Sequence, residues 1–293
     1  MAADFFGLPV HSIGNRALTV DCLARGGPRI ARLRPAGRDD NLLAEVPDLH
    51  WPTPYGMYHL RGGHRLWHAP EAPLPSDVPD DDDVTLEATA AGLTLRAVEQ
   101  PTGLEKTIAI ALCGDEPRLS VRHTLRNLGA EPLEVAPWAI TMLPLGGWAI
   151  VAQQRAVTDQ RLPDRHVVVW PYTRWRDTRL HVDDDFIVVD AQASATALKI
   201  GCLSAGWIGY LRGDFGLIKR FDPQPDRPHP DRNCNAEVYC NQRFIELESL
   251  GASVCLAPGA AVEHVEQWEV VTGLEPPPAP DQLIELVKSQ HLI

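Results

Sequence analysis

The chain has 293 residues, a net charge of −12 and a sequence pI near 5.3. Hydrophobic residues make up 44% and charged residues 23%, which is typical of a globular protein with a sizeable core. The acidic charge argues against nucleic acid and against an anionic membrane surface as partners, because both attract clustered Lys and Arg. No apolar run reaches the roughly 18 residues of a membrane-spanning helix. The first residues also lack the basic start and apolar run of a signal peptide.

The cysteines give a second indication of the compartment. The six cysteines are scattered, most of them in apolar runs, and none forms a Cys-x-x-Cys pair. Cys234 and Cys240 are separated by a spacing that is unusual for zinc. We therefore expect six free thiols, no disulfide framework and a cytoplasmic protein.

Short runs with period-two alternation dominate the chain. Residues 84–89 and 93–97 alternate in the same sense around a turn, which predicts a β-hairpin. More than a dozen such runs follow one another from 17–23 to 262–271, and 22 glycines and 26 prolines punctuate the chain. This pattern predicts an all-β fold, a large antiparallel β-sandwich. No polar linker divides residues 1–272, so we expect a single domain.

The end of the chain differs from the rest. Residues 273–280 form a Pro-rich segment that predicts an extended spacer. Residues 281–293 carry Leu283, Ile284 and Leu286 at the spacing of one helix face. We expect a short C-terminal helix that docks either on the sandwich or on a second subunit, which would make a homodimer.

One candidate site lies in residues 244–250, which read as a strand. Glu246 and Glu248 alternate there with aliphatic residues, so both carboxylates point to one face, roughly 7 Å apart. Such a pair suits acid/base chemistry on a small polar ligand. Glu237 and Tyr239, slightly earlier in the chain, are candidate ligand contacts. The alternative is a solvated outer face with ordinary acids.

The second candidate segment is 60–71, where two glycines precede a run of basic and aromatic residues. The glycines allow the backbone to pass close to a bulky group. We interpret the segment as a polar cleft, in which Trp67 stacks on a sugar face and Arg61 or Arg65 grips hydroxyls or an anion. His64 would carry protons near neutral pH. Surface arginines around a packed tryptophan are the alternative.

Other candidates are less specific. In a strand, His64 and His68 lie roughly 13 Å apart, too far to share one metal ion, so we expect no metal there and count His68 with the cleft. Lys219 is a candidate ligand anchor near a strand end. His123 falls on the apolar phase of its strand, which favours a hydrogen-bonded core histidine. The acidic run 80–83 is typical of a solvated loop.

Taken together, these motifs resemble the galactose mutarotase superfamily, and most closely a bacterial branch of it. The segment 61–63 with the Trp/Pro residues after it resembles the Arg-Gly-Gly segment of hexose-6-phosphate mutarotases. Residues 244–248 with the loop 256–259 resemble the catalytic-glutamate segment. Residues 119–127, leading to 137–139, are similar to the strand pair that carries the family's catalytic histidine.

The resemblance covers about residues 10–272 and implies a β-supersandwich with a carbohydrate-sized cleft on one sheet. It implies that Glu248 is the general base that removes the anomeric hydroxyl proton and that Arg61 contacts the substrate. Where the family places its acid histidine, this chain has Trp138. The acid must then come from elsewhere, and His64 is the candidate. No cofactor is implied.

These observations predict a carbohydrate-active enzyme that resembles aldose 1-epimerases, an isomerase acting on a small-molecule sugar. Two alternatives stay open. One is a sugar-binding module without chemistry. The other is a glycoside hydrolase or lyase in which Glu246 and Glu248 both act, since their spacing overlaps the ~6.5–9.5 Å of inverting glycosidases.

Overall fold

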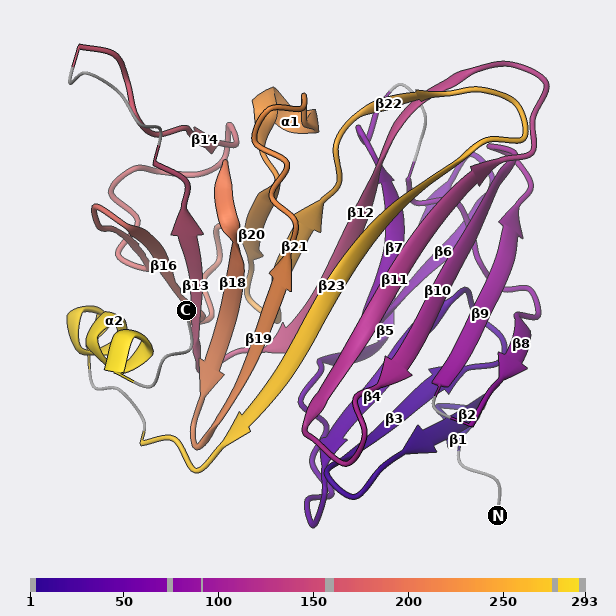
Figure 1. Cartoon of the computed structure of the whole chain (residues 1–293), viewed down its shortest axis with the longest axis horizontal. Helices are drawn as coiled ribbons and strands as arrows, with labels where there is room; N and C mark the ends of the chain where they lie inside the picture. Colours follow the sequence, from indigo (N-terminus) through magenta and orange to yellow (C-terminus); the bar gives the residue numbers. More distant parts are fainter. Residues whose placement is uncertain (1–3, 73–75, 91, 156–160, 276–278, 290–293) are drawn as a thin grey trace.

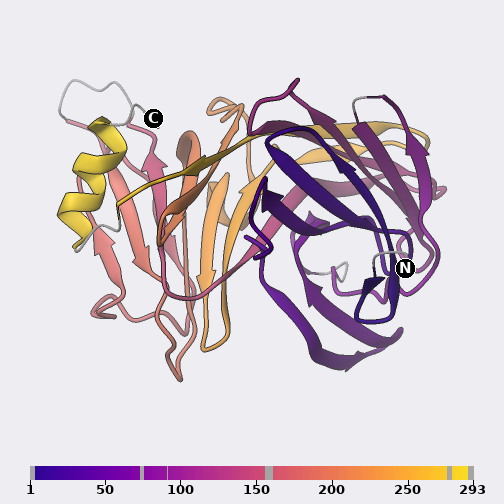
Figure 2. The same cartoon turned by 90° about the horizontal axis from the view of Figure 1, so that it is seen from below.

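The computed structural model describes residues 4–72, 76–90, 92–155, 161–275 and 279–289. Within these residues, antiparallel strands form an 11-stranded sheet, a 10-stranded sheet and a two-stranded sheet. The two large sheets face each other as a sandwich, with residues 4–5 and residues 280–289 toward opposite ends of the molecule (Figures 1 and 2). The predicted all-β sandwich with a short C-terminal helix is confirmed.

The 11-stranded sheet carries both candidate segments at its centre. Its order is β1 (Asp4–Phe5), β2 (Leu8–Gly14), β3 (Leu18–Leu23), β4 (Arg29–Pro35), β7 (His64–Ala69), β12 (Leu133–Pro144), β21 (Phe244–Leu250), β20 (Ala236–Cys240), β17 (Leu198–Cys202) and β14 (Val167–Val169), with β22 (Val254–Leu256) paired to β12.

The 10-stranded sheet has the last strand of the chain in its interior. Its order is β15 (Leu180–Val182), β16 (Phe186–Asp190), β13 (Trp148–Gln153), β18 (Ser204–Arg212), β19 (Phe215–Phe221), β23 (Ala261–Thr272), β11 (Arg118–Asn127), β10 (Leu104–Leu112), β9 (Gly92–Glu99) and β8 (Thr85–Ala88). Strand β23 thus pairs with β19 on one side and with β11 on the other, and it joins β8–β11 to the rest of the sheet (Figure 1). The predicted hairpin of residues 84–97 is β8–β9.

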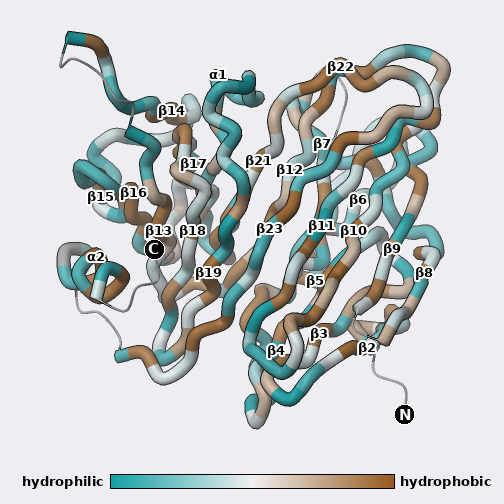
Figure 3. The backbone as a smooth tube through the Cα atoms, viewed as in Figure 1, coloured by the Kyte–Doolittle hydropathy of each residue, from teal (hydrophilic) through white to brown (hydrophobic). Residues whose placement is uncertain are grey.

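The main core lies between the two large sheets. Strand β10 shows why: Leu104, Ile108 and Ile110 are buried on one face, where Lys106 is the one charged residue, while the residues of the other face are mostly half-buried. Hydropathy changes in the same way from residue to residue along many strands (Figure 3). Because this core uses only the inner face of each sheet, the outer faces are left for other contacts.

A hairpin covers part of the outer face of the 11-stranded sheet. It consists of β5 (Glu45–Thr53) and β6 (Gly56–Gly62). Tyr58 of β6 packs its ring against Trp51 and Trp67, with ring centroids 4.9 and 5.7 Å apart. A second apolar cluster therefore forms on this face, and Trp138 belongs to it.

The part of the chain that the structure describes has two helices, both short. Helix α1 (Pro230–Asn233) precedes β20, and α2 (Pro280–Ser289) begins one residue before the predicted start. Helix α2 packs Leu283, Ile284 and Val287 on the outer face of the 10-stranded sheet, at one end of the molecule (Figure 2). It thus docks on the sandwich of its own chain. Neither helix in the described residues has the length and apolarity needed to cross a membrane.

Candidate active site

A cavity of about 440 Å³ lies on the outer face of the 11-stranded sheet, beside the β5–β6 hairpin. We call it the sheet cavity. Its volume is in the range of small-molecule sites. Among the described residues that line it, seven are aromatic, two are cationic and two are carboxylic acids. The lining comprises Leu49, Trp51, Leu60, Arg65, Trp67, Glu71, Trp138, Ile140, Trp170, Tyr172, Lys199, Tyr239, Asn241, Phe244 and Glu246.

The alternation of β21 brings two acids to the cavity face. Ile245 and Leu247 lie in the core between the sheets. Glu246 and Glu248 therefore point to the outer face, as the sequence predicts. Neither is solvated: Glu246 is 8% exposed and Glu248 is fully buried. The interpretation of this face as ordinary surface is thus wrong.

Strand register places further polar groups beside these acids. Glu237 of β20 is opposite Glu248, and Tyr239 is opposite Glu246. On the next strand, β17, Lys199 is opposite Tyr239. Residues far apart in the sequence therefore meet across three adjacent strands of one sheet face.

Lys199 is the centre of a buried charged group. Its Nζ lies 2.8 Å from Glu237 Oε2 and 3.0 Å from Glu248 Oε2, and Trp138 Nε1 donates to the same Glu248 oxygen at 2.8 Å. Burial alone would lower the pKa of Lys199, but the two carboxylates raise it well above its usual value. Burial also raises the pKa of Glu237 well above its usual value, against the effect of Lys199. Lys199 is therefore held protonated.

Arg65 and Glu246 form a second pair, and both line the cavity. Arg65 Nη2 donates to Glu246 Oε1 at 3.0 Å, and its guanidinium lies 4.3 Å from the centre of the Trp67 ring. Burial raises the pKa of Glu246, while Arg65 opposes that rise. Glu246 is therefore the floor carboxyl that a ligand in the cavity can reach, whereas Glu248 lies beneath Lys199 and Trp138.

The predicted site residues fall into four places. Arg65, Trp67, Trp138, Tyr239 and Glu246 line the sheet cavity together. Glu237 and Glu248 lie in the layer below it and are fully buried.

Arg61 lies elsewhere, and its placement corrects the expected substrate contact. Its Nη1 is 2.5 Å from Asp80 Oδ1, and its Nη2 pairs with Asp81, so the acidic loop holds it away from the cavity. The two glycines that follow Arg61 allow close packing against neighbouring backbone. A Cβ on Gly62 would lie 2.1 Å from the carbonyl oxygen of Ala44, which only glycine avoids.

His64, His68 and Lys219 also lie outside the cavity. The two histidines alternate with Arg65 and Trp67 along β7, so they point to the opposite face, into the space between the sheets. Both are fully buried, as is Lys219. The interpretation that places His64 as the acid in the same cleft as Arg65 is therefore wrong.

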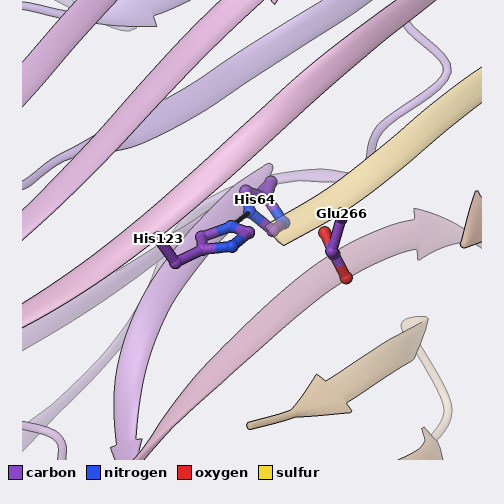
Figure 4. A group of neighbouring side chains, drawn as sticks. All are labelled: His64, His123 and Glu266. Carbon is purple, nitrogen blue, oxygen red and sulfur yellow. Dashed lines mark hydrogen bonds between the residues drawn. The ribbon is translucent and has the colours of Figure 1, made fainter. Parts of the chain in front are cut away.

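Two of these interior residues, His64 and Lys219, belong to what we call the inner polar cluster, which joins the two sheets. His64, Thr141 and Ser249 come from the 11-stranded sheet. His123, Lys219, His264 and Glu266 come from the 10-stranded sheet. Figure 4 shows His64, His123 and Glu266 facing one another.

The hydrogen bonds of this cluster fix its proton positions. His123 Nδ1 lies 3.0 Å from the carbonyl oxygen of His264, which can only accept, so His123 carries its proton there. Its Nε2 then accepts from His64 Nε2 at 2.7 Å, and His64 Nδ1 accepts from the Thr141 hydroxyl at 2.9 Å. His123 is thus the hydrogen-bonded core histidine that the sequence predicts.

Glu266 is the anion of the cluster. Its oxygens accept from Lys219 at 2.6 Å, from Ser249 at 2.6 Å and from Trp268 Nε1 at 2.7 Å. Burial would raise its pKa, but Lys219 and the histidines hold the pKa of Glu266 well below its usual range. Burial in turn lowers the pKa of His123 to about 4.

The ligand atoms of His64, His123 and Glu266 all lie within 4.8 Å of one another, close enough to hold a metal ion. Their donor chemistry does not fit one well. His64 Nε2 donates its proton to His123 Nε2, and Lys219 already neutralises Glu266. The arrangement is that of a saturated hydrogen-bond network.

Sequence reasoning missed several cavity residues, notably Lys199, Trp170 and Tyr172, and gave no role to Glu71 at the end of the predicted cleft segment. Lys199 had a usable signal, because it is a single charge inside the apolar run 197–203. The others lie near strand ends or in loops, where no periodicity indicates their direction.

No family model matches the chain, and no curated protein matches it. Solved structures do. A candidate mutarotase, YeaD, from Salmonella typhimurium superposes with a TM-score of 0.59 at 11% identity, covering 92% of each chain. A galactose mutarotase-like protein from Lactobacillus casei gives 0.55 at 12% identity, covering 89% of this chain and 99% of that one.

A candidate aldose 1-epimerase from Escherichia coli K12 gives a TM-score of 0.53 at 13% identity, covering 91% of this chain and all of that one. At such identities the likeness establishes the fold. The chain has the galactose mutarotase-like fold, as the sequence motifs suggest.

Proposed function

We propose that the sheet cavity binds a carbohydrate and that the protein catalyses aldose 1-epimerase-type acid/base chemistry on it. The observation that carries the proposal is Glu246. It is a carboxyl with a raised pKa that reaches an aromatic cavity of sugar size and is oriented by Arg65. Aromatic rings suit the apolar faces of sugars, and a carboxyl tuned toward neutrality suits proton transfer.

In this mechanism Glu246 removes the proton of the anomeric hydroxyl. Tyr239, opposite it in register, gives a proton to the ring oxygen. Burial raises the pKa of Tyr239, so its hydroxyl is protonated at neutral pH. The ring opens, the C1–C2 bond rotates, and the reverse transfers close the ring and restore both residues. Lys199 donates hydrogen bonds and offsets the developing negative charge.

Glu248 and Glu237 then act through Lys199. Glu248 is covered by Lys199 and Trp138, so it holds the cation in place and does not touch the sugar. This revises the role that the sequence resemblance implies for Glu248. It also counts against a hydrolase that needs both Glu246 and Glu248 at the substrate.

The test is anomer interconversion, followed by NMR line exchange over a panel of sugars. Glu246→Gln keeps the side chain's shape and removes the base, so turnover should fall about 10²–10⁴-fold while binding remains. Glu269→Gln on β23 of the other sheet is the matched control and should keep full activity. A wild-type protein that binds sugars without accelerating exchange would establish a binding module. Full activity in Glu246→Gln would return the role of base to Glu248.

A further inference from the structure

The two cations that line the sheet cavity are already paired with carboxylates of its own floor. Arg65 Nη2 lies 3.0 Å from Glu246. Lys199 Nζ lies within 3.0 Å of both Glu237 and Glu248. A buried ion pair resists separation, because the partner left behind would be a buried charge without compensation.

The mouth of the cavity adds more negative charge. Glu71 lines the cavity, with its side chain exposed at the mouth. Partial desolvation raises the pKa of Glu71, Lys199 lowers it, and the acids Glu248, Asp77 and Asp231 raise it further. An entering ligand therefore meets a lining in which Glu71 and Glu246 match the two cations in number, with Glu237 and Glu248 buried beneath Lys199.

Arg61 lies in the motif that resembles hexose-6-phosphate mutarotases, but it adds no positive charge to the cavity lining. Arg61 is engaged by Asp80 and Asp81 and is absent from the cavity lining. Among the described lining residues, Arg65 and Lys199 are the cations.

Uncharged and anionic sugars would meet this cavity differently. Among the described residues, Nε and Nη1 of Arg65 have no hydrogen-bond partner, but both atoms are buried. A phosphate or carboxylate would therefore reach the cations only by competing with Glu246 for Arg65, or with a floor carboxylate for Lys199, after passing Glu71. An uncharged sugar needs only hydrogen bonds to the groups already in place and contact with the aromatic walls.

We infer that the sheet cavity selects uncharged sugars over their phosphorylated and carboxylated counterparts, and that Glu71 is a specificity-determining residue for this choice. The inference rests on the proposed carbohydrate function.

The experiment measures dissociation constants by calorimetry at low ionic strength, where charge effects are least screened. The probes are D-glucose and D-galactose, their 6-phosphates, the corresponding uronates, and inorganic phosphate. Wild type is compared with Glu71→Gln and with Glu87→Gln, an exposed acid on β8 of the other sheet as matched control. We expect the anionic sugars to bind at least about tenfold more weakly than the uncharged ones. Glu71→Gln should narrow that gap several-fold, and Glu87→Gln should leave it unchanged.

The experiment distinguishes a failure of the proposed selectivity from a failure of the proposed carbohydrate function. Binding of uncharged sugars with equal or tighter binding of their 6-phosphates would overturn the selectivity and leave the carbohydrate function standing. So would binding of inorganic phosphate that competes with sugar. If Glu71→Gln leaves the difference in affinity between uncharged and anionic sugars unchanged, Glu71 does not determine that specificity. Binding of no sugar of either kind would overturn the proposed function and this inference with it.

Discussion

Replacing Lys219 by methionine tests how the inner polar cluster stabilises the fold. Lys219 and Glu266 are both fully buried, with Nζ and Oε1 2.6 Å apart. The change removes one charge of a buried pair and leaves Glu266 without its cation. It also takes away the hydrogen bond that Lys219 donates to Thr141 at 2.9 Å.

The expected cost follows from this geometry. Breaking a buried ion pair by removing one partner costs about 3–5 kcal/mol. That is a large share of the roughly 5–15 kcal/mol by which a domain is stable. The neighbouring pair Arg220–Glu269 joins the same strands, β19 and β23, at 2.9 Å, but its side chains are 37% and 33% exposed. Arg220→Met should therefore cost about 1 kcal/mol or less.

Urea unfolding near pH 7, followed by tryptophan fluorescence and circular dichroism, gives the free energy of unfolding by linear extrapolation. The double variant Lys219→Met/Glu266→Gln removes the unpaired charge and should recover part of the loss. A loss of unfolding free energy in Lys219→Met no larger than in Arg220→Met would contradict the cost expected for breaking a buried pair. A double variant less stable than Lys219→Met alone would contradict it as well.

Two further predictions concern protons and thiols. His123 has an ordinary pKa near 6.5 when unfolded and about 4 when folded. The unfolded chain therefore binds its proton first, and stability falls as the pH drops from about 6.5 to about 4, by roughly 3 kcal/mol from this residue. A urea midpoint that stays constant from pH 7 to pH 4.5 would contradict this. For the thiols, Cys113 and Cys255 are exposed and the other four cysteines are buried. Two thiols should react quickly in the native protein and six in denaturant, and fewer than six in denaturant would reveal a disulfide.

The sequence contains enough information for the fold and for one side of the cavity. Period-two alternation places Glu246 and Glu248 on the outer face of β21, because successive side chains of a strand must point to opposite faces. The same rule, applied to residues 64–69, separates His64 and His68 from Arg65 and Trp67. Placing these four residues in one cleft overlooked that constraint.

The rest of the site depends on register between distant strands. Lys199 meets Glu248 only because β20 lies between β17 and β21 in the sheet. The burial of Glu248 depends on this neighbour and on Trp138. Local alternation predicts on which face of a strand a side chain lies. It does not predict which strand is adjacent in the sheet or which side chain covers another.

The position of β23 has a consequence for how the chain is made. Residues 261–272 are synthesised after every other strand of the 10-stranded sheet, yet they fill its middle between β11 and β19. Until they leave the ribosome, both neighbours present open hydrogen-bonding edges, which can pair with other chains. Pairing β11 with β23 also joins Arg118 to Glu269 and so closes a very long loop. Such distant pairing is slow. The block β8–β11 of a nascent chain therefore waits for its partner strand while residues 128–260 are made, and during this interval its open edge favours pairing with other chains.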